Sequence, residues 1–136
     1  MAPIGAPLTA ADRALVRAAQ AALRRGYDAT RHTVAAAVRT RAGRTFVGLN
    51  LNGLFTPCAE PVALGTAITA GDPEVVSMVA VHRRGARFPV LSPCGTCRQM
   101  LYDYAPRATA LVAFPGGSVR RLTAAECLPG AYATFG

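Results

Sequence analysis

Two short cysteine-bearing segments constrain this chain more than any other feature. Pro57-Cys58-Ala59-Glu60 leads into an apolar stretch over 62–70, and Pro93-Cys94-Gly95-Thr96-Cys97 opens a predicted helix over 95–104. Each segment therefore falls where a loop enters a helix. Helix N-termini present unpaired N–H groups and partial positive charge, which stabilise thiolates. We expect a fold that brings these two helix starts together.

The spacing of the cysteines predicts an open metal site. Cys94 and Cys97 lie three residues apart, so they share one helical face and can share one ion, and Cys58 would supply a third thiolate. Three protein ligands leave the fourth tetrahedral position for water, which is the layout of a catalytic zinc site. Glu60 would then lie beside the metal-bound water, where a carboxylate can take a proton and return it to a leaving nitrogen. Alone, Glu60 would be interpreted as a charge in the first turn of a helix.

A fourth cysteine leaves an alternative open. Cys127 stands in an apolar context, Ala125-Glu126-Cys127-Leu128, which is typical of a packed core thiol. If Cys127 instead closed the coordination sphere, the chain would be a structural zinc fold acting as a binding module. His32 and His82 have no metal-ligand spacing, and we interpret them as ordinary surface or strand-end residues.

The remaining pattern predicts one α/β domain over residues 1–136 with a mixed five-stranded sheet. A helix is predicted over 8–25, with Thr9 as N-cap and Gly26 at its end. The predicted strands span 33–40, 45–51, 75–82, 108–114 and 119–122. Pro115-Gly116-Gly117 is a tight turn, so the last two strands form an antiparallel hairpin without a crossover helix.

Composition limits the classes of partner. The chain has 136 residues, its apolar runs are too short to cross a membrane, and Met1–Gly5 lacks the regions of a secretory signal, so we expect a cytoplasmic protein. The formal charge is +8, and all 15 basic residues are Arg. They are scattered without a basic run or interleaved aromatics, which makes a nucleic-acid substrate the weaker alternative.

Cys58-Ala59-Glu60 followed by Pro93-Cys94-Gly95-Thr96-Cys97-Arg98-Gln99 resembles the cytidine deaminase superfamily, and within it the small-molecule branch that includes blasticidin-S deaminase. The resemblance implies a three-layer α-β-α fold and a homotetramer. It implies one Zn²⁺ per subunit on Cys58, Cys94 and Cys97, with Glu60 as the proton shuttle. The implied reaction is hydrolytic deamination of a cytosine nucleoside or an analogue to the uracil form with release of ammonia. The substrate would be a free nucleoside such as cytidine, deoxycytidine or blasticidin S.

The resemblance also implies substrate contacts and reveals two departures. The backbone at Ala59 and the carbonyl of Ser92 would meet the base edge and the leaving amine, and Asn50 would hold the sugar. Tyr132 and Phe135 would cross a subunit interface and pack on the base, or else belong to a frayed tail. The family usually has Glu at the position of Asn52, which favours a neutral or modified sugar. It often has Arg at the position of Pro61, so Arg98 and the helix dipoles would offset the thiolate charge here.

Overall fold

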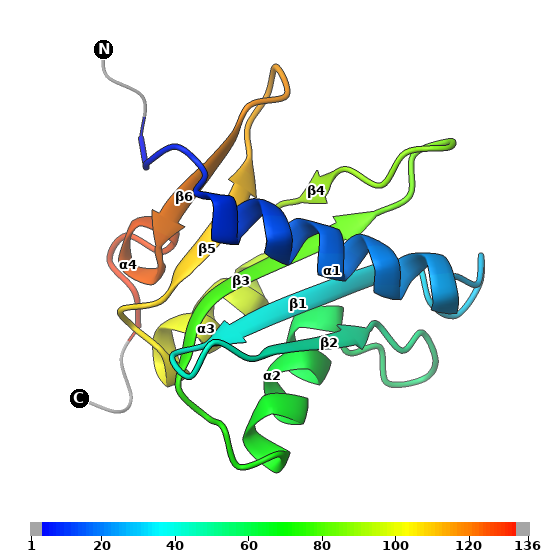
Figure 1. The fold of residues 1–136 in the computed structure, drawn as a ribbon, viewed down its shortest axis with the longest axis horizontal. Helices are drawn as coiled ribbons and strands as arrows, with labels where there is room; N and C mark the ends of the chain where they lie inside the picture. Colours follow the sequence, from blue (N-terminus) through cyan, green and yellow to red (C-terminus); the bar gives the residue numbers. More distant parts are fainter. Residues whose placement is uncertain (1–3, 133–136) are drawn as a thin grey trace.

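The computed structural model describes residues 4–132, which form a mixed β-sheet flanked by helices (Figure 1). The helices are α1 (Ala10–Gly26), α2 (Ala59–Thr69), α3 (Gly95–Tyr104) and α4 (Ala124–Cys127). The strands are β1 (Val34–Thr40), β2 (Thr45–Leu49), β3 (Val75–His82), β4 (Val90–Leu91), β5 (Thr109–Ala113) and β6 (Val119–Thr123). The predicted helix over 62–70 in fact begins at Ala59, so it includes Glu60 in its first turn.

The sheet has the order β2-β1-β3-β5-β6, with β4 paired to β3. The β3–β5 pair is parallel and the other pairs are antiparallel, including the predicted terminal hairpin of β5 and β6. The five predicted strands and the mixed character of the sheet are confirmed. The sixth strand, β4, was not predicted, because two residues carry no readable periodicity.

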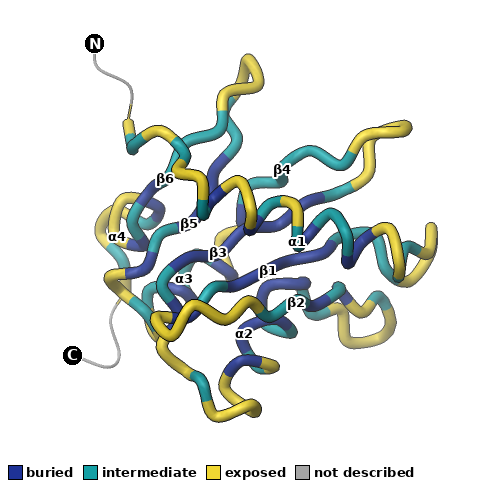
Figure 2. Tube along the Cα trace, viewed as in Figure 1, coloured by how far each residue is buried: buried dark blue, intermediate teal, exposed yellow. Residues whose placement is uncertain are grey.

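Alternation of side chains along the strands separates two cores. Successive residues of a strand point to opposite faces. On one face, Leu15 and Leu23 of α1 pack against alternate residues of β1 and β3. On the other face, Leu64 of α2 and Leu101 of α3 belong to a second cluster that includes Met78. The predicted three-layer α-β-α architecture is therefore confirmed, and Figure 2 shows the buried strands between the helical layers.

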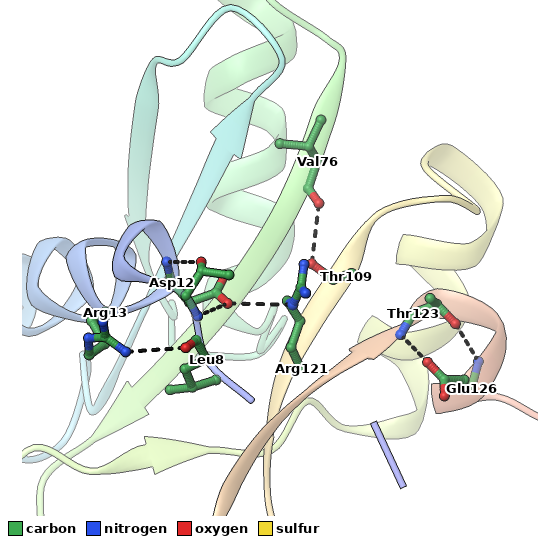
Figure 3. A network of polar contacts seen from close by, with 9 residues as sticks. Leu8, Asp12, Arg13, Val76, Thr109, Arg121, Thr123 and Glu126 are labelled. Atoms are coloured by element: carbon green, nitrogen blue, oxygen red, sulfur yellow. Dashed lines mark hydrogen bonds and ion pairs between the residues drawn. The ribbon is translucent and has the colours of Figure 1, made fainter. Parts of the chain in front are cut away.

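A polar network fixes α1 to the far strand of the sheet (Figure 3). The Thr9 hydroxyl accepts from the Asp12 N–H, and the Asp12 carboxylate accepts from the Thr9 N–H, which completes a capping box. The same buried carboxylate lies 3.6 Å from Nε of Arg121 on β6. A second capping box, from Thr123 and Glu126, begins the unpredicted helix α4. The start of helix α1 is thus tied to strand β6.

Helix α2 lies unusually close to β2. A Cβ atom at Gly48 would stand 2.6 Å from the backbone nitrogen of Ala63, so only glycine allows this approach. The contact fixes α2, and with it the first turn that carries Glu60, against the edge of the sheet. None of the helices described is both long and apolar enough to cross a membrane.

Candidate active site

Three cysteine thiols meet between the starts of α2 and α3. Cys58 and Cys94 are the N-caps of these helices. The Sγ atoms of Cys58, Cys94 and Cys97 lie within 4.8 Å of one another, and those of Cys58 and Cys94 are 3.6 Å apart. Tetrahedral zinc with Zn–S bonds of about 2.3 Å would separate its sulfurs by about 3.8 Å. The spacing of the three thiols therefore fits a single zinc ion.

The protonation tendencies of these thiols also fit a cation site. Burial raises the pKa of the Cys58 and Cys97 thiols. Burial also acts to raise the pKa of Cys94, but hydrogen bonds from the Cys97 backbone N–H and the Cys58 thiol outweigh it and lower that pKa overall. Three crowded thiolates are stable only beside a positive charge, so metal binding here must release protons.

Glu60 lies beside this cluster in the first turn of α2. Its side chain is almost fully buried, at 4% exposure, and burial raises the pKa of its carboxyl group. A buried carboxyl group with a raised pKa in a cleft is suited to take up and release a proton during a reaction.

A cleft of about 290 Å³ opens over Glu60 and the thiols. It is lined by Val34, Asn50, Thr56, Pro57, Cys58, Ala59, Glu60, Leu91, Ser92 and Cys94. These lining residues include no arginine and no histidine. In a chain of charge +8, the cleft is thus a region without basic side chains.

Asn50 lines the cleft, but its carboxamide is already engaged. Its Oδ1 accepts from the backbone N–H groups of Thr33 and Val34, at 2.7 and 3.0 Å. Its Nδ2 donates to the Thr33 hydroxyl and to Oδ1 of Asn52. The expectation that Asn50 simply holds a sugar missed this role. In the structure, Asn50 ties the start of β1 to the segment that follows β2.

The other predicted contact residues differ in how they are held. Ser92 Oγ donates to the carbonyl of Ala113 and accepts from its N–H, which fixes the Ser92 backbone against β5. Ala59 is fully buried as the first residue of α2, where backbone N–H groups have no intrahelical acceptor. Tyr132 is 75% exposed, and its carbonyl accepts from Gln99 Nε2. Phe135 lies outside the described residues.

Cys127 and Arg98 lie behind the thiol cluster. Cys127 is buried in the core on the α2–α3 side of the sheet and is not one of the three clustered thiols. Arg98 Nε donates to the carbonyl of Pro93 at 2.8 Å, and its Nη1 donates to the carbonyl of Cys127 at 3.1 Å. A positive charge is therefore bonded to the residue that precedes Cys94.

An α-β-α fold whose two helix starts bring together three thiols able to hold one zinc ion, beside a buried carboxyl group, is shared with known deaminases and places this chain among the zinc-dependent hydrolytic deaminases acting on C–N bonds. The chain belongs to the family of the cytidine and deoxycytidylate deaminase zinc-binding region, whose model matches residues 9–113.

Named relatives agree with this membership. Blasticidin-S deaminase of Bacillus cereus is 34% identical over 87% of this chain and 89% of the relative. Cytidine deaminase of Halalkalibacterium halodurans is 32% identical over 76% of this chain and 79% of the relative. The crystal structure of cytidine deaminase from Burkholderia pseudomallei superposes with a TM-score of 0.73 at 30% identity, covering 92% of this chain and 100% of that one.

Proposed function

We propose that this enzyme deaminates a free cytosine nucleoside, or a cytosine-nucleoside analogue with an uncharged or modified sugar, to its uracil form. The observation that carries the proposal is the buried Glu60 carboxyl group beside three clustered thiols, in a cleft whose lining includes no basic side chain. A nucleotide substrate would bring a phosphate, for which arginine is the side chain that proteins favour. The names of the relatives, blasticidin-S deaminase and cytidine deaminase, support the same substrate class.

Each residue of the cleft has a task in this proposal. Cys58, Cys94 and Cys97 would hold a zinc ion, which would supply Lewis-acid chemistry that activates water for hydrolysis. Glu60 takes a proton from the attacking water and delivers it to N3 of the base, then takes the remaining proton of the new hydroxyl group and delivers it to the departing amine. The C4–N bond breaks, a C4–O bond forms with oxygen from water, and ammonia leaves.

The backbone orients the base during this exchange. The Ala59 N–H donates to the base edge, and the Ser92 carbonyl accepts from the leaving amine. The Ser92 hydroxyl both donates to and accepts from the backbone of Ala113 in β5. These two bonds hold the Ser92 carbonyl in place during the reaction, which favours a single orientation of the base. The sugar then faces Asn50, whose carboxamide already makes its hydrogen bonds within the protein. Asn50 therefore offers the sugar few hydrogen bonds, which favours substrates whose sugar needs no charged contact.

A substrate panel tests the proposal. We expect the zinc-loaded enzyme to remove the cytosine absorbance band of cytidine, deoxycytidine or blasticidin S, and to leave deoxycytidylate unchanged. Glu60→Gln should keep the fold, by circular dichroism, and the zinc content, by metal analysis, while losing at least about a hundredfold in kcat, because a general acid–base contributes roughly that much. Absence of turnover on every nucleoside in the panel, or full activity of the Glu60→Gln variant, would contradict the proposal.

We also propose a homotetramer. Past the buried Glu60, helix α2 has no charged residue, and its solvent side presents Pro61, Val62 and Ile68, the last of them 40% exposed. Thr66 and Thr69 are polar residues exposed on that helix, and a helix side without charge can be covered by a second copy of the chain. In such an assembly the exposed Tyr132 could reach the cleft of a neighbouring copy.

We further propose a cytoplasmic location, because a three-cysteine zinc site needs reduced thiols.

A further inference from the structure

A second hollow, larger than the cleft over Glu60, lies between two diverging hairpins. It has a volume of about 690 Å³. One wall comes from the β3–β4 hairpin, through His82, Arg84, Arg87 and Val90, and the other from the β5–β6 hairpin around Phe114 and Val119. Figure 1 shows the two hairpins projecting apart at the same end of the sheet. We call this hollow the hairpin slot.

Arg84 and Arg87 face each other in an arrangement that opposes folding. Their backbones form a pair of hydrogen bonds, of 2.8 and 3.0 Å, that closes the turn at Gly85-Ala86. Like charges directly opposite each other on paired strands are destabilising. Within residues 4–132 neither guanidinium makes an ion pair or a side-chain hydrogen bond with another residue. The repulsion between them is therefore not relieved inside the chain.

The two stretches of chain that line the slot carry no negative charge. The chain has no Asp or Glu between Glu74 and Asp103, or between Asp103 and Glu126, and these two stretches contain every lining residue of the slot. Burial and the nearby Arg84 lower the pKa of His82, in keeping with this uncompensated positive field.

Contacts with α1 and with Tyr27 anchor the hairpin that carries the two arginines. Arg83 lies over the Tyr27 ring at 4.8 Å and donates to the Gly85 carbonyl. Arg24 lies over the Phe88 ring at 5.0 Å, and Gln20 Nε2 donates to the Phe88 carbonyl. The neighbouring arginine of the hairpin is thus held by an aromatic ring and a carbonyl, whereas Arg84 and Arg87 remain free on a backbone that is already ordered. A rigid support lowers the entropy cost of binding a ligand there.

We propose that the hairpin slot binds a small phosphate-bearing anion, a di- or triphosphate, through Arg84 and Arg87. Guanidinium groups form paired, charge-assisted hydrogen bonds with phosphate oxygens. Two of them on facing strands match two adjacent phosphate groups, and the volume of the slot leaves room for an attached organic group. A local arrangement that costs stability without compensation inside the chain is characteristic of a functional site. The slot and the cleft over Glu60 share no lining residue: Val90 lines the slot, and the next residues of the chain, Leu91 and Ser92, line the cleft.

Calorimetric titration of the zinc-loaded protein with tripolyphosphate tests the proposal. We expect saturable binding that weakens with salt and survives in the Glu60→Gln variant. The double variant Arg84→Gln/Arg87→Gln should bind about a hundredfold more weakly, since each charge-assisted bond contributes about tenfold. The double variant Arg17→Gln/Arg25→Gln is the matched control, because it removes the same charge from exposed positions of α1.

Further arms distinguish the sources of phosphate and the competing explanations. A nucleoside triphosphate that binds tenfold tighter than tripolyphosphate identifies a nucleotide ligand, and equal affinities identify the phosphate chain alone. Equal losses in the two double variants would reduce the binding to general attraction by net charge and overturn the proposal, as would absence of binding. A single-stranded oligonucleotide that binds more tightly than either small ligand would replace it with nucleic-acid binding.

The thermal stability of the ligand-free protein tests the repulsion between the two arginines. Without ligand, the Arg84→Gln/Arg87→Gln variant should have a Tm no lower than that of the wild type, because the substitutions remove this repulsion. A clear decrease in Tm would contradict the proposal.

Discussion

Among single residues, Arg98 joins the metal loop to the C-terminal part of the chain. Its guanidinium bonds the carbonyls of Pro93 and Cys127 together. Arg98→Lys keeps the positive charge but loses the planar fork that reaches two acceptors. We expect zinc affinity to fall about tenfold or more, as is typical when a group that orients a metal ligand is lost, and chelator competition would measure it. Arg107→Gln, on an exposed arginine far from the thiols, should leave that affinity unchanged; equal zinc affinities for Arg98→Lys and the wild type would deny Arg98 this role.

The two kinds of cysteine in this chain should respond differently to serine. Cys127 packs in the core, so Cys127→Ser should keep one zinc per chain and lower the free energy of unfolding by about 1–3 kcal/mol, because it buries a hydroxyl group. Cys97→Ser should lose the zinc. Metal analysis and denaturant titration of both variants would check this, and loss of zinc from Cys127→Ser would instead indicate a four-cysteine structural site.

At this scale the sequence was sufficient to group the three thiols and insufficient to reveal the contacts of Asn50, while the catalytic role of Glu60 stays a prediction. Metal ligands have strict spacing and chemistry, so Cys58, Cys94 and Cys97 could be grouped from their positions alone. The engagement of Asn50 depends on where the backbone N–H groups of Thr33 and Val34 lie. That contact joins residues distant in sequence, and no local pattern reveals it.

Among the elements, the position of α2 against β2 depends on a single glycine, Gly48. Gly48→Ala would push a methyl group into the backbone of α2 near Ala63. We expect a loss of about 1–3 kcal/mol in the free energy of unfolding, typical of overpacking, together with reduced zinc affinity, because α2 also carries Cys58. Thermal melts and chelator competition would measure both. Thr45→Ala, at an exposed position of the same strand, is the control, and a Gly48→Ala variant as stable as this control would refute the close approach.

The long elements could be predicted and the short ones could not. Helix α3 and strand β3 coincide with their predicted bounds, because each carries enough residues for its periodicity to be read. Strand β4 has two residues and α4 has four. Their existence depends on tertiary pairing with β3 and on the capping box of Thr123 and Glu126, so the hairpin slot beside β4 was equally hidden.

For the whole molecule, the uncharged side of α2 sets the expected assembly. Ile68→Glu places a charge on that side without disturbing the core, since Ile68 is 40% exposed. We expect light scattering after size-exclusion chromatography to give a tetramer mass for the wild type and a smaller species for Ile68→Glu, because an unpaired charge buried at an interface is costly. Ala14→Glu, at an exposed position of α1, should remain tetrameric. A monomeric wild type would refute the assembly.

The cysteines that begin α2 and α3 occupy positions where serine, aspartate or asparagine would cap the helix. Sulfur is a weak hydrogen-bond acceptor, so these two helix starts have weak side-chain caps in the apoprotein, even where the Cys97 N–H is bonded to the Cys94 thiol. A mutation to serine at either site would improve the cap by about 1 kcal/mol while destroying the metal site. Selection for stability alone would therefore favour serine at these positions and remove the activity. Related proteins that have lost the activity in this way are expected to have a higher Tm than the apoprotein of this enzyme.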